Sequence, residues 1–159
     1  MKKHIIEIEY SEVDSINNLS NEDAYLVAKA REVANNAWAP YSNFLVGAAV
    51  ELENGKVIIG NNQENAAYPS GLCAERVALF AANAGYPNSA VKTIAISAFN
   101  KKGHVQEPVK PCGSCRQAIL EAETRFEKPI KLLLDGANSI YIMEGIASLL
   151  PLSFGKRDL

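Results

Sequence analysis

The first half of the chain changes from helical to strand-like spacing of its hydrophobic positions. Apolar residues recur at helical intervals over residues 20–38, after a serine that can cap the first turn, and Pro40 is expected to end this helix. Residues 44–52 and 56–60 are rich in β-forming side chains, and Asn54-Gly55 joins them as a strong hairpin signal. The pattern predicts a helix followed by an antiparallel pair of strands.

The second half predicts two further helices and three further strands. The helices are expected over residues 72–84, which are apolar almost all round and therefore buried, and over residues 112–126. The polar stretches 61–71 and 100–110 are expected to be loops, and the strands are expected over residues 91–99, 130–135 and 139–143. Three residues between the last two strands are too few for a parallel crossover, so these strands are expected to be antiparallel.

These elements predict an α/β fold, a three-layer α/β/α sandwich around a five-stranded mixed sheet. Residues 1–20 are expected to form an N-terminal extension, in which residues 4–10 alternate partly and indicate a short strand or an extended arm. Residues 21–159 are expected to form a single catalytic domain. No internal repeat or second domain is indicated.

Composition narrows the possible partners and compartment. The chain is 48% hydrophobic and 21% charged, without the long uncharged run that a membrane span requires, so no membrane association is expected. No signal-peptide core follows the basic N-terminus, and the odd number of cysteines suits a reducing compartment, so a cytoplasmic protein is expected. The net charge of −2 and the lack of a basic stripe argue against a nucleic-acid partner.

All three cysteines lie in two short segments that indicate a metal site. Cys73 is followed two residues later by Glu75, and Cys112 and Cys115 lie in a Pro-Cys-Gly-Ser-Cys segment. A structural zinc site normally has four protein ligands, whereas a catalytic site has three and one open position. The count of thiols therefore predicts one catalytic Zn²⁺ per chain. A redox Cys-X-X-Cys pair is the alternative, but it would leave Cys73 and Glu75 unexplained.

Charge is the difficulty for such a site, because three thiolates leave a dication with a net negative charge. Cys73 and Cys112 lie at the starts of predicted helices, whose dipoles favour thiolates. Arg76 and Arg116 follow them at spacings that return each side chain to the metal end of its helix. Neither arginine has an acidic neighbour at helical spacing within its own helix, so both are predicted to balance the charge of the thiolates.

Glu75 has two interpretations. A glutamate in a first helical turn is commonly only a favourable charge at the helix dipole. A carboxylate two residues from a zinc ligand, and not itself needed as a ligand, can instead accept a proton from an activated water molecule and pass it on. The combination with three cysteines favours the catalytic interpretation.

Three cysteines with a nearby non-ligand glutamate form the signature of zinc nucleobase deaminases. Over roughly residues 24–155 the chain resembles the small, homotetrameric cytidine deaminases in four segments: NFLVGAA (43–49), NQENAAYPSGLCAER (62–76), PCGSCRQ (111–117) and LLPLSF (149–154). The resemblance implies zinc-dependent hydrolysis of cytidine and 2′-deoxycytidine to uridine and 2′-deoxyuridine with release of ammonia, as in pyrimidine salvage. It also implies a homotetramer with sites completed by neighbouring subunits.

The resemblance assigns roles residue by residue. It implies zinc ligation by Cys73, Cys112 and Cys115, proton transfer by Glu75, ribose binding by Asn62 and Glu64, stacking near the base by Phe44, a backbone amide contact from Ala74, and entry of Phe154 into a neighbouring subunit's site. From the residues alone, Phe44 and Phe154 could equally be core residues, and Asn62 and Glu64 turn formers. Trp38 is expected in the core.

Three alternatives compete with a cytidine deaminase. A deaminase of a cytosine-containing nucleoside antibiotic of the blasticidin type would be slow on plain cytidine. Nucleic-acid deaminases favour a histidine where Cys73 stands, and they need a basic channel. A non-enzymatic protein that uses zinc only to join two helices needs a fourth ligand, for instance His104.

Overall fold

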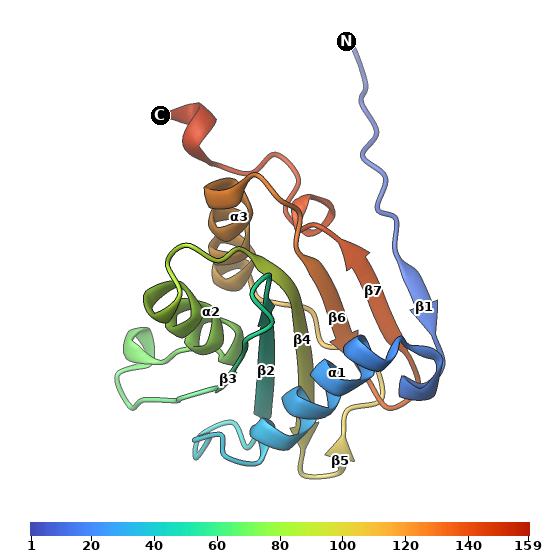
Figure 1. The fold of residues 1–159 in the computed structure, drawn as a ribbon, viewed down its shortest axis with the longest axis vertical. Coiled ribbons are helices and arrows are strands. Elements are labelled where there is room, and N and C mark those ends of the chain that lie inside the picture. The colour runs from blue at the N-terminus through green and yellow to red at the C-terminus, as the bar shows by residue number, and fades with distance from the viewer.

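The computed structural model describes all 159 residues. The chain folds into one mixed sheet with helices on both of its faces (Figure 1). The sheet has seven strands in the order β1-β7-β6-β4-β2-β3, with β5 paired to β4, and only β4 and β6 are parallel. The strands are β1 (Ser11–Val13), β2 (Leu45–Leu52), β3 (Val57–Asn61), β4 (Val91–Asn100), β5 (Gly103–His104), β6 (Lys131–Asp135) and β7 (Ile140–Glu144). The helices are α1 (Asn21–Ala34), α2 (Ala74–Gly85) and α3 (Gly113–Phe126).

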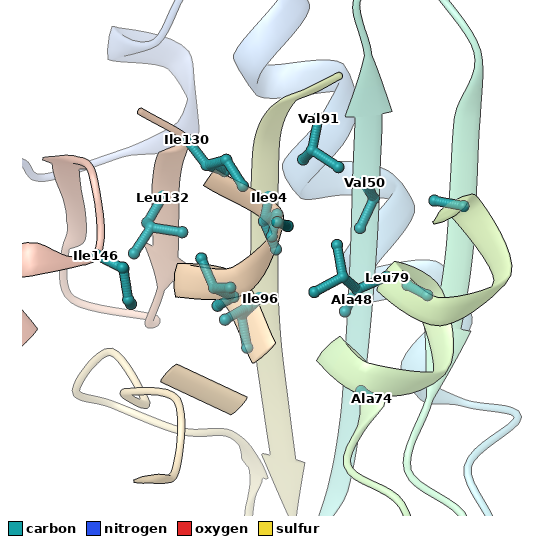
Figure 2. Close-up of a cluster of buried hydrophobic side chains, with 14 of the residues drawn as sticks. Ala48, Val50, Ala74, Leu79, Val91, Ile94, Ile96, Ile130, Leu132 and Ile146 are labelled. Carbon is teal, nitrogen blue, oxygen red and sulfur yellow. The ribbon is translucent and has the colours of Figure 1, made fainter. Parts of the chain in front are cut away.

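The two faces of the sheet carry separate hydrophobic cores, because side chains alternate along each strand. Ala49, Ala95 and Leu133 pack under α1. On the opposite face, residues of the same strands, among them Ile94 and Leu132, pack with α2 and α3 (Figure 2). The predicted three-layer α/β/α arrangement is therefore confirmed, as is the antiparallel pairing of the strands after Ile130.

The sheet has seven strands where five were predicted. The additional strands are β1, which pairs with the outer edge of β7, and β5, a two-residue strand that folds back on β4 at Gly103. Gly103 has a φ of +102°, which only glycine adopts easily. Both strands form by pairing with a longer strand of the sheet, and neither has an alternation of hydrophobic and polar residues that would have predicted it. Residues 4–10 form no strand, and the chain before Tyr10 extends away from the body of the protein (Figure 1).

Helix α1 begins as predicted and ends earlier than predicted. The hydroxyl of Ser20 accepts a hydrogen bond from the amide of Asp23 at 3.1 Å. The helix ends at Ala34 and not at Pro40, because the chain turns so that Trp38 pairs through its backbone with the loop around Asn62. The prediction that Trp38 lies in the core is wrong: its side chain is 61% exposed. None of the helices is both long and apolar enough to cross a membrane.

Helix α2 packs against β3 with very little space between the two backbones. A Cβ atom on Gly60 would lie 2.5 Å from the Ala78 nitrogen and 2.8 Å from the Ala74 oxygen. The absence of a side chain at Gly60 therefore allows α2 to approach the sheet closely. The prediction that α2 is buried all round is wrong, since Phe80 is 48% exposed. The close approach to β3 therefore involves the segment of α2 from Ala74 to Ala78.

Candidate zinc and substrate site

The three cysteines meet where the first turns of α2 and α3 converge. Cys73 is the N-cap residue of α2 and Cys112 is the N-cap residue of α3, and neither side chain makes a capping hydrogen bond. Cys115 lies in the first turn of α3 and is buried. Two helix N-termini therefore direct their partial positive charge and unpaired amides toward the three sulfurs, an environment that favours thiolates.

The spacing of the sulfurs suits one zinc ion. The Sγ atoms of Cys73 and Cys112 are 3.7 Å apart, those of Cys112 and Cys115 are 3.5 Å apart, and all three lie within 4.8 Å of one another. Tetrahedral coordination with Zn–S bonds of about 2.3 Å requires sulfurs about 3.8 Å apart. The group contains three protein ligands and no fourth. Its geometry and chemistry fit one Zn²⁺ per chain with an open position.

The thiols already have unequal proton affinities without a metal. A hydrogen bond from the Cys115 thiol, with further support from Arg76, lowers the pKa of Cys73 to about 5. The same contact, together with burial, raises the pKa of Cys115. Cys73 is therefore the first of this pair to become a thiolate, which is the form that binds zinc.

The two arginines predicted to balance the thiolates have different contacts. Nη2 of Arg76 lies 4.0 Å from the Cys73 sulfur, and its Nε is buried without a hydrogen-bond partner. Arg116 instead donates to two backbone carbonyls, from Nε to Pro111 at 2.8 Å and from Nη1 to Leu149 at 2.6 Å. Arg76 thus faces a thiolate directly, whereas Arg116 ties the segment before Cys112 to the C-terminal tail. The charge-balancing role stays a prediction for both.

Glu75 lies in the first turn of α2, only 5% exposed, and makes none of the ion pairs in the protein. Burial raises its pKa above the ordinary value, and its own backbone amide opposes this in part. Such a carboxylate holds a proton more readily than one in water. It can therefore act as a proton acceptor and donor.

A cavity of about 580 Å³ opens beside Cys73. Ligand pockets in proteins are typically about 300 to 1,000 Å³ in volume, so a nucleoside fits the available space. The lining residues include Tyr41, Ser42, Asn62, Glu64, Tyr68 and Arg76. Of the residues predicted to bind substrate, Asn62 and Glu64 line this cavity, whereas Phe44, Ala74 and Phe154 do not.

Asn62 and Glu64 also hold the turn before β2. Asn62 accepts a hydrogen bond from the Val46 amide at 2.8 Å and donates one to the Phe44 carbonyl at 2.9 Å. Glu64 accepts hydrogen bonds from the Tyr41 amide at 2.9 Å and from both the amide and the hydroxyl of Ser42. The Ser42 hydroxyl contributes most to lowering the pKa of Glu64, which keeps this carboxylate ionised. Asn62 and Glu64 thus stabilise a turn through these hydrogen bonds. Because both residues also line the cavity, their side-chain oxygens are hydrogen-bond acceptors at its wall.

Sequence reasoning missed two aromatic residues at the cavity. The rings of Tyr41 and Tyr68 lie edge to face with centroids 6.0 Å apart, and both residues line the cavity. Their positions inside the segments YSNF and AYPS were the available signal.

Phe154 lies on the C-terminal tail, is 61% exposed, and accepts a hydrogen bond through its carbonyl from Gln117 at 3.0 Å.

Sequence reasoning also missed a polar cluster on the α1 face of the sheet. Asp135, at the end of β6, is fully buried and accepts two hydrogen bonds from Arg31 at 2.7 and 2.8 Å. Ser97 donates to the same carboxylate at 2.7 Å, and Nε2 of His104 lies 3.1 Å from it. His104 is thus engaged here and is not part of the metal group.

The fold and the three-sulfur cluster define a zinc-binding α/β protein with an open metal position. Residues 20–127 match the family described as the cytidine and deoxycytidylate deaminase zinc-binding region, and the chain belongs to this family. It is similar to the cytidine deaminase of Sporosarcina psychrophila, with 36% identity over 142 residues, 84% of this chain and 92% of that protein. It is also similar to a cytidine deaminase of Mycobacterium tuberculosis, with 32% identity over 137 residues, 84% of this chain and 90% of that protein.

Solved structures agree with the family. The crystal structure of cytidine deaminase from Burkholderia pseudomallei matches with a TM-score of 0.72 and 33% identity, over 86% of this chain and 100% of that chain. Cytidine deaminase from Mycobacterium tuberculosis matches with a TM-score of 0.62 and 31% identity, over 82% of this chain and 95% of that chain. The matched family region contains all three cysteines and Glu75.

Proposed function

We propose that the protein hydrolytically deaminates cytidine and 2′-deoxycytidine to uridine and 2′-deoxyuridine with release of ammonia, a reaction of pyrimidine salvage. The observation that carries this proposal is the open three-sulfur cluster together with the buried carboxylate of Glu75, which lies in the first turn of α2, two residues after Cys73. The curated relatives described above are named cytidine deaminases, which supports the same substrate class.

The proton transfers can be derived from the position of Glu75. When bound, zinc acidifies a water molecule and supplies positive charge to the reacting centre. Glu75 accepts a proton from that water and delivers it to N3 of the pyrimidine as the water oxygen adds to C4. The proton of the added hydroxyl group then passes through Glu75 to the amino group, and the C4–N bond breaks as the C4 carbonyl forms, so that ammonia leaves and the uracil base remains. The raised pKa of Glu75 suits a group that must act both as base and as acid.

The cavity beside Cys73 supports binding of a ribose. Asn62 and the ionised Glu64 present acceptors at its wall, and hydroxyl groups of a sugar can donate to them. Phe44 is proposed to stack near the base, and the backbone amide of Ala74, at the N-terminus of α2, to contact it. A sugar-binding wall favours a nucleoside over a free base.

We also propose that the active form is a homotetramer in which Phe154 enters the site of a neighbouring subunit. Phe154 does not line its own cavity and is 61% exposed, and Phe80 on α2 is 48% exposed. Light scattering tests the tetramer directly. Co-expression of Glu75→Gln chains with Phe154→Ala chains tests the shared site, because some mixed sites would combine an intact Glu75 with an intact Phe154. Activity above the sum of the two separate variants is expected, and no gain would contradict a shared site.

A nucleoside panel tests the activity. Cytidine and 2′-deoxycytidine should release ammonia in step with the absorbance change to the uridine product, and the zinc content measured in parallel should be about one ion per chain. A blasticidin-type nucleoside and a cytosine-containing single-stranded DNA are the comparison substrates. Faster turnover of the antibiotic or the DNA than of cytidine would overturn the proposal, as would zinc-loaded protein that is inert on every substrate.

A further inference from the structure

The N-terminal segment of residues 10–13 lies outside the region that matches the family, which begins at residue 20. Its last three residues nonetheless form a strand of the sheet, β1. Ser11, Glu12 and Val13 pair with Ile142, Tyr141 and Ile140 of β7 in antiparallel register. This segment therefore adds an outer strand next to β7, and its side chains alternate between the two faces of the sheet.

The side of this segment that carries Tyr10 faces the same layer as the metal site. Val13 packs against the core under α1, whereas Tyr141 packs against the core under α2 and α3. Tyr10 lies two residues before Glu12, which is opposite Tyr141, so its ring meets Tyr141 diagonally. The centroids of the two rings are 4.6 Å apart and the ring planes are tilted by 39°, a separation within the range of favourable aromatic pairs.

Tyr141 in turn contacts the segment that carries a zinc ligand. Nζ of Lys110 lies 4.9 Å from the centroid of the Tyr141 ring, within the range of a cation–π interaction. Lys110 is followed by Pro111 and then by Cys112. Proline fixes its own φ and restricts the residue before it to extended backbone, so this short connection is stiff. Lys110 therefore lies two residues from Cys112, across a connection with little backbone freedom whose Pro111 carbonyl is also held by Arg116.

Cys112 is the cysteine that depends most on such support. It is exposed, whereas Cys73 is half-buried and Cys115 is buried, so less packing holds it in place. We propose that Tyr10 and Tyr141 are positioning residues: they hold Lys110 and thereby Cys112 where zinc requires the third sulfur. The inference rests on the zinc site and not on the identity of the substrate.

Zinc release from the holoenzyme tests this proposal without any substrate. The wild-type protein and its variants are mixed with excess 4-(2-pyridylazo)resorcinol, and the rate of zinc transfer is followed by absorbance at a temperature where every variant is folded by circular dichroism. Tyr10→Ala and Lys110→Gln should each speed release about two- to fivefold, as expected for loss of one exposed cation–π or aromatic contact. The double variant should release zinc no faster than the faster single variant, because both changes break the same relay. Tyr10→Phe and Lys110→Arg should restore the wild-type rate.

Two matched controls separate positioning from general stability. Tyr25→Ala removes another exposed tyrosine with a lysine over its ring, on α1 and away from the cysteines, and should leave zinc release unchanged. Val13→Ala weakens the same segment on its opposite face and should lower the melting temperature with little effect on release.

Equal acceleration by Val13→Ala and Tyr10→Ala at equal loss of stability would overturn the proposal. So would a wild-type release rate for both Tyr10→Ala and Lys110→Gln. Cobalt-substituted protein provides a second measurement, since a change in the sulfur-to-cobalt absorption is expected for Lys110→Gln and not for Lys110→Arg. An unchanged spectrum in Lys110→Gln would also count against it.

Discussion

Two buried carboxylates lie on opposite faces of the same sheet, and their surroundings differ. Asp135 is fully buried and accepts hydrogen bonds from Arg31 and Ser97, with His104 at 3.1 Å. Glu75 is 5% exposed and makes no ion pair. Burial without a strong charged partner raises the pKa of Glu75. A carboxylate with saturated contacts stabilises the fold, whereas one left without an ion pair can exchange protons.

The difference follows from where each nearby arginine is directed. Arg31 extends from α1 and places two donors on the two oxygens of Asp135. Arg76 lies next to Glu75 in sequence, yet its guanidinium is directed to the Cys73 sulfur at 4.0 Å. The guanidinium nearest the metal site is therefore directed toward a cysteine sulfur, and Glu75 is left without a salt bridge. An arginine thus forms an ion pair with Asp135 on one face of the sheet, whereas on the other face the arginine next to Glu75 leaves that carboxylate free to exchange protons.

The largest expected effect is on activity, from Glu75→Gln. An amide of the same shape cannot accept or donate the transferred proton, so kcat/KM for cytidine should fall about 10²- to 10⁴-fold. The free energy of unfolding should stay unchanged or rise slightly, because the amide carries no charge to bury. Steady-state assays and urea titration measure the two quantities, with zinc content as the control. If Glu75→Gln lost as much stability as an Asp135 variant, the distinction between a catalytic Glu75 and a structural Asp135 would be wrong.

The next effect is on stability, from Asp135→Ala. Removal of the carboxylate leaves Arg31 and Ser97 without their partner, and we expect a loss of about 3 kcal/mol in the free energy of unfolding. Urea titration of the metal-free proteins measures it, and Asp135→Asn, which retains part of the hydrogen bonding, should lose less. At a temperature where the variant stays folded, kcat should be close to that of the wild type. A large fall in kcat with intact stability would assign Asp135 to the chemistry.

A third expected effect separates the two arginines. Arg76→Gln removes the cation that faces the Cys73 thiolate, and zinc affinity should fall about 10- to 100-fold, as for other groups that support metal ligands. Arg76→Lys keeps the charge and should retain more of the affinity. Competition with a chromophoric chelator measures both. Arg31→Gln is the matched control: it should lower stability and leave zinc affinity unchanged, and the reverse pattern would contradict the assignment of the arginines.

The smallest expected effect is a pH dependence at His104. Burial lowers the pKa of His104, and this outweighs the opposite influence of Asp135. As the pH falls below about 6.5, the ordinary histidine pKa, the unfolded chain takes up a proton that the folded chain resists. The free energy of unfolding should therefore fall as the pH decreases from 7.5 toward the lowered pKa. Urea titrations of metal-free wild type and His104→Asn at several pH values measure the slope, which should be shallower in the variant. A steeper slope in the variant would mean that the pKa is raised instead.

Local signals made much of the fold predictable. The cap at Ser20, the Asn54-Gly55 turn and the Pro111-Cys112 helix start act over a few residues, and the structure has an element boundary at each of them. Strand β1 was not predictable, because its three residues carry no periodic pattern and its partners on β7 lie more than a hundred positions later in the chain. The early end of α1 was missed for a similar reason: Trp38 is held by backbone pairing with a loop that follows the hairpin.

Some features of the site could likewise be predicted from the sequence and others could not. The convergence of Cys73 with Cys112 and Cys115 could be inferred because the chemistry of three thiols demands it, and the structure places the three sulfurs together. The different contacts of Arg76 and Arg116 could not be inferred, because helical spacing returns either side chain to its helix start but does not select its acceptor. The cluster of Asp135 was also out of reach, since Arg31 lies 104 residues away in sequence.

The missing side chain at Gly60 bears on the size of ion that the protein can select. Cys73 is the N-cap residue of α2, whereas Cys112 and Cys115 lie at the start of α3. The closeness of α2 to β3 depends on the empty space at Gly60, where a Cβ would meet the Ala78 nitrogen at 2.5 Å. A methyl group at this position would lift α2 and carry the Cys73 sulfur with it, changing its separation from the other two. An ion with a larger radius, such as cadmium, would tolerate a wider triangle of sulfurs better than zinc. A methyl group at position 60 is therefore expected to shift the preference of the site from zinc toward a larger ion.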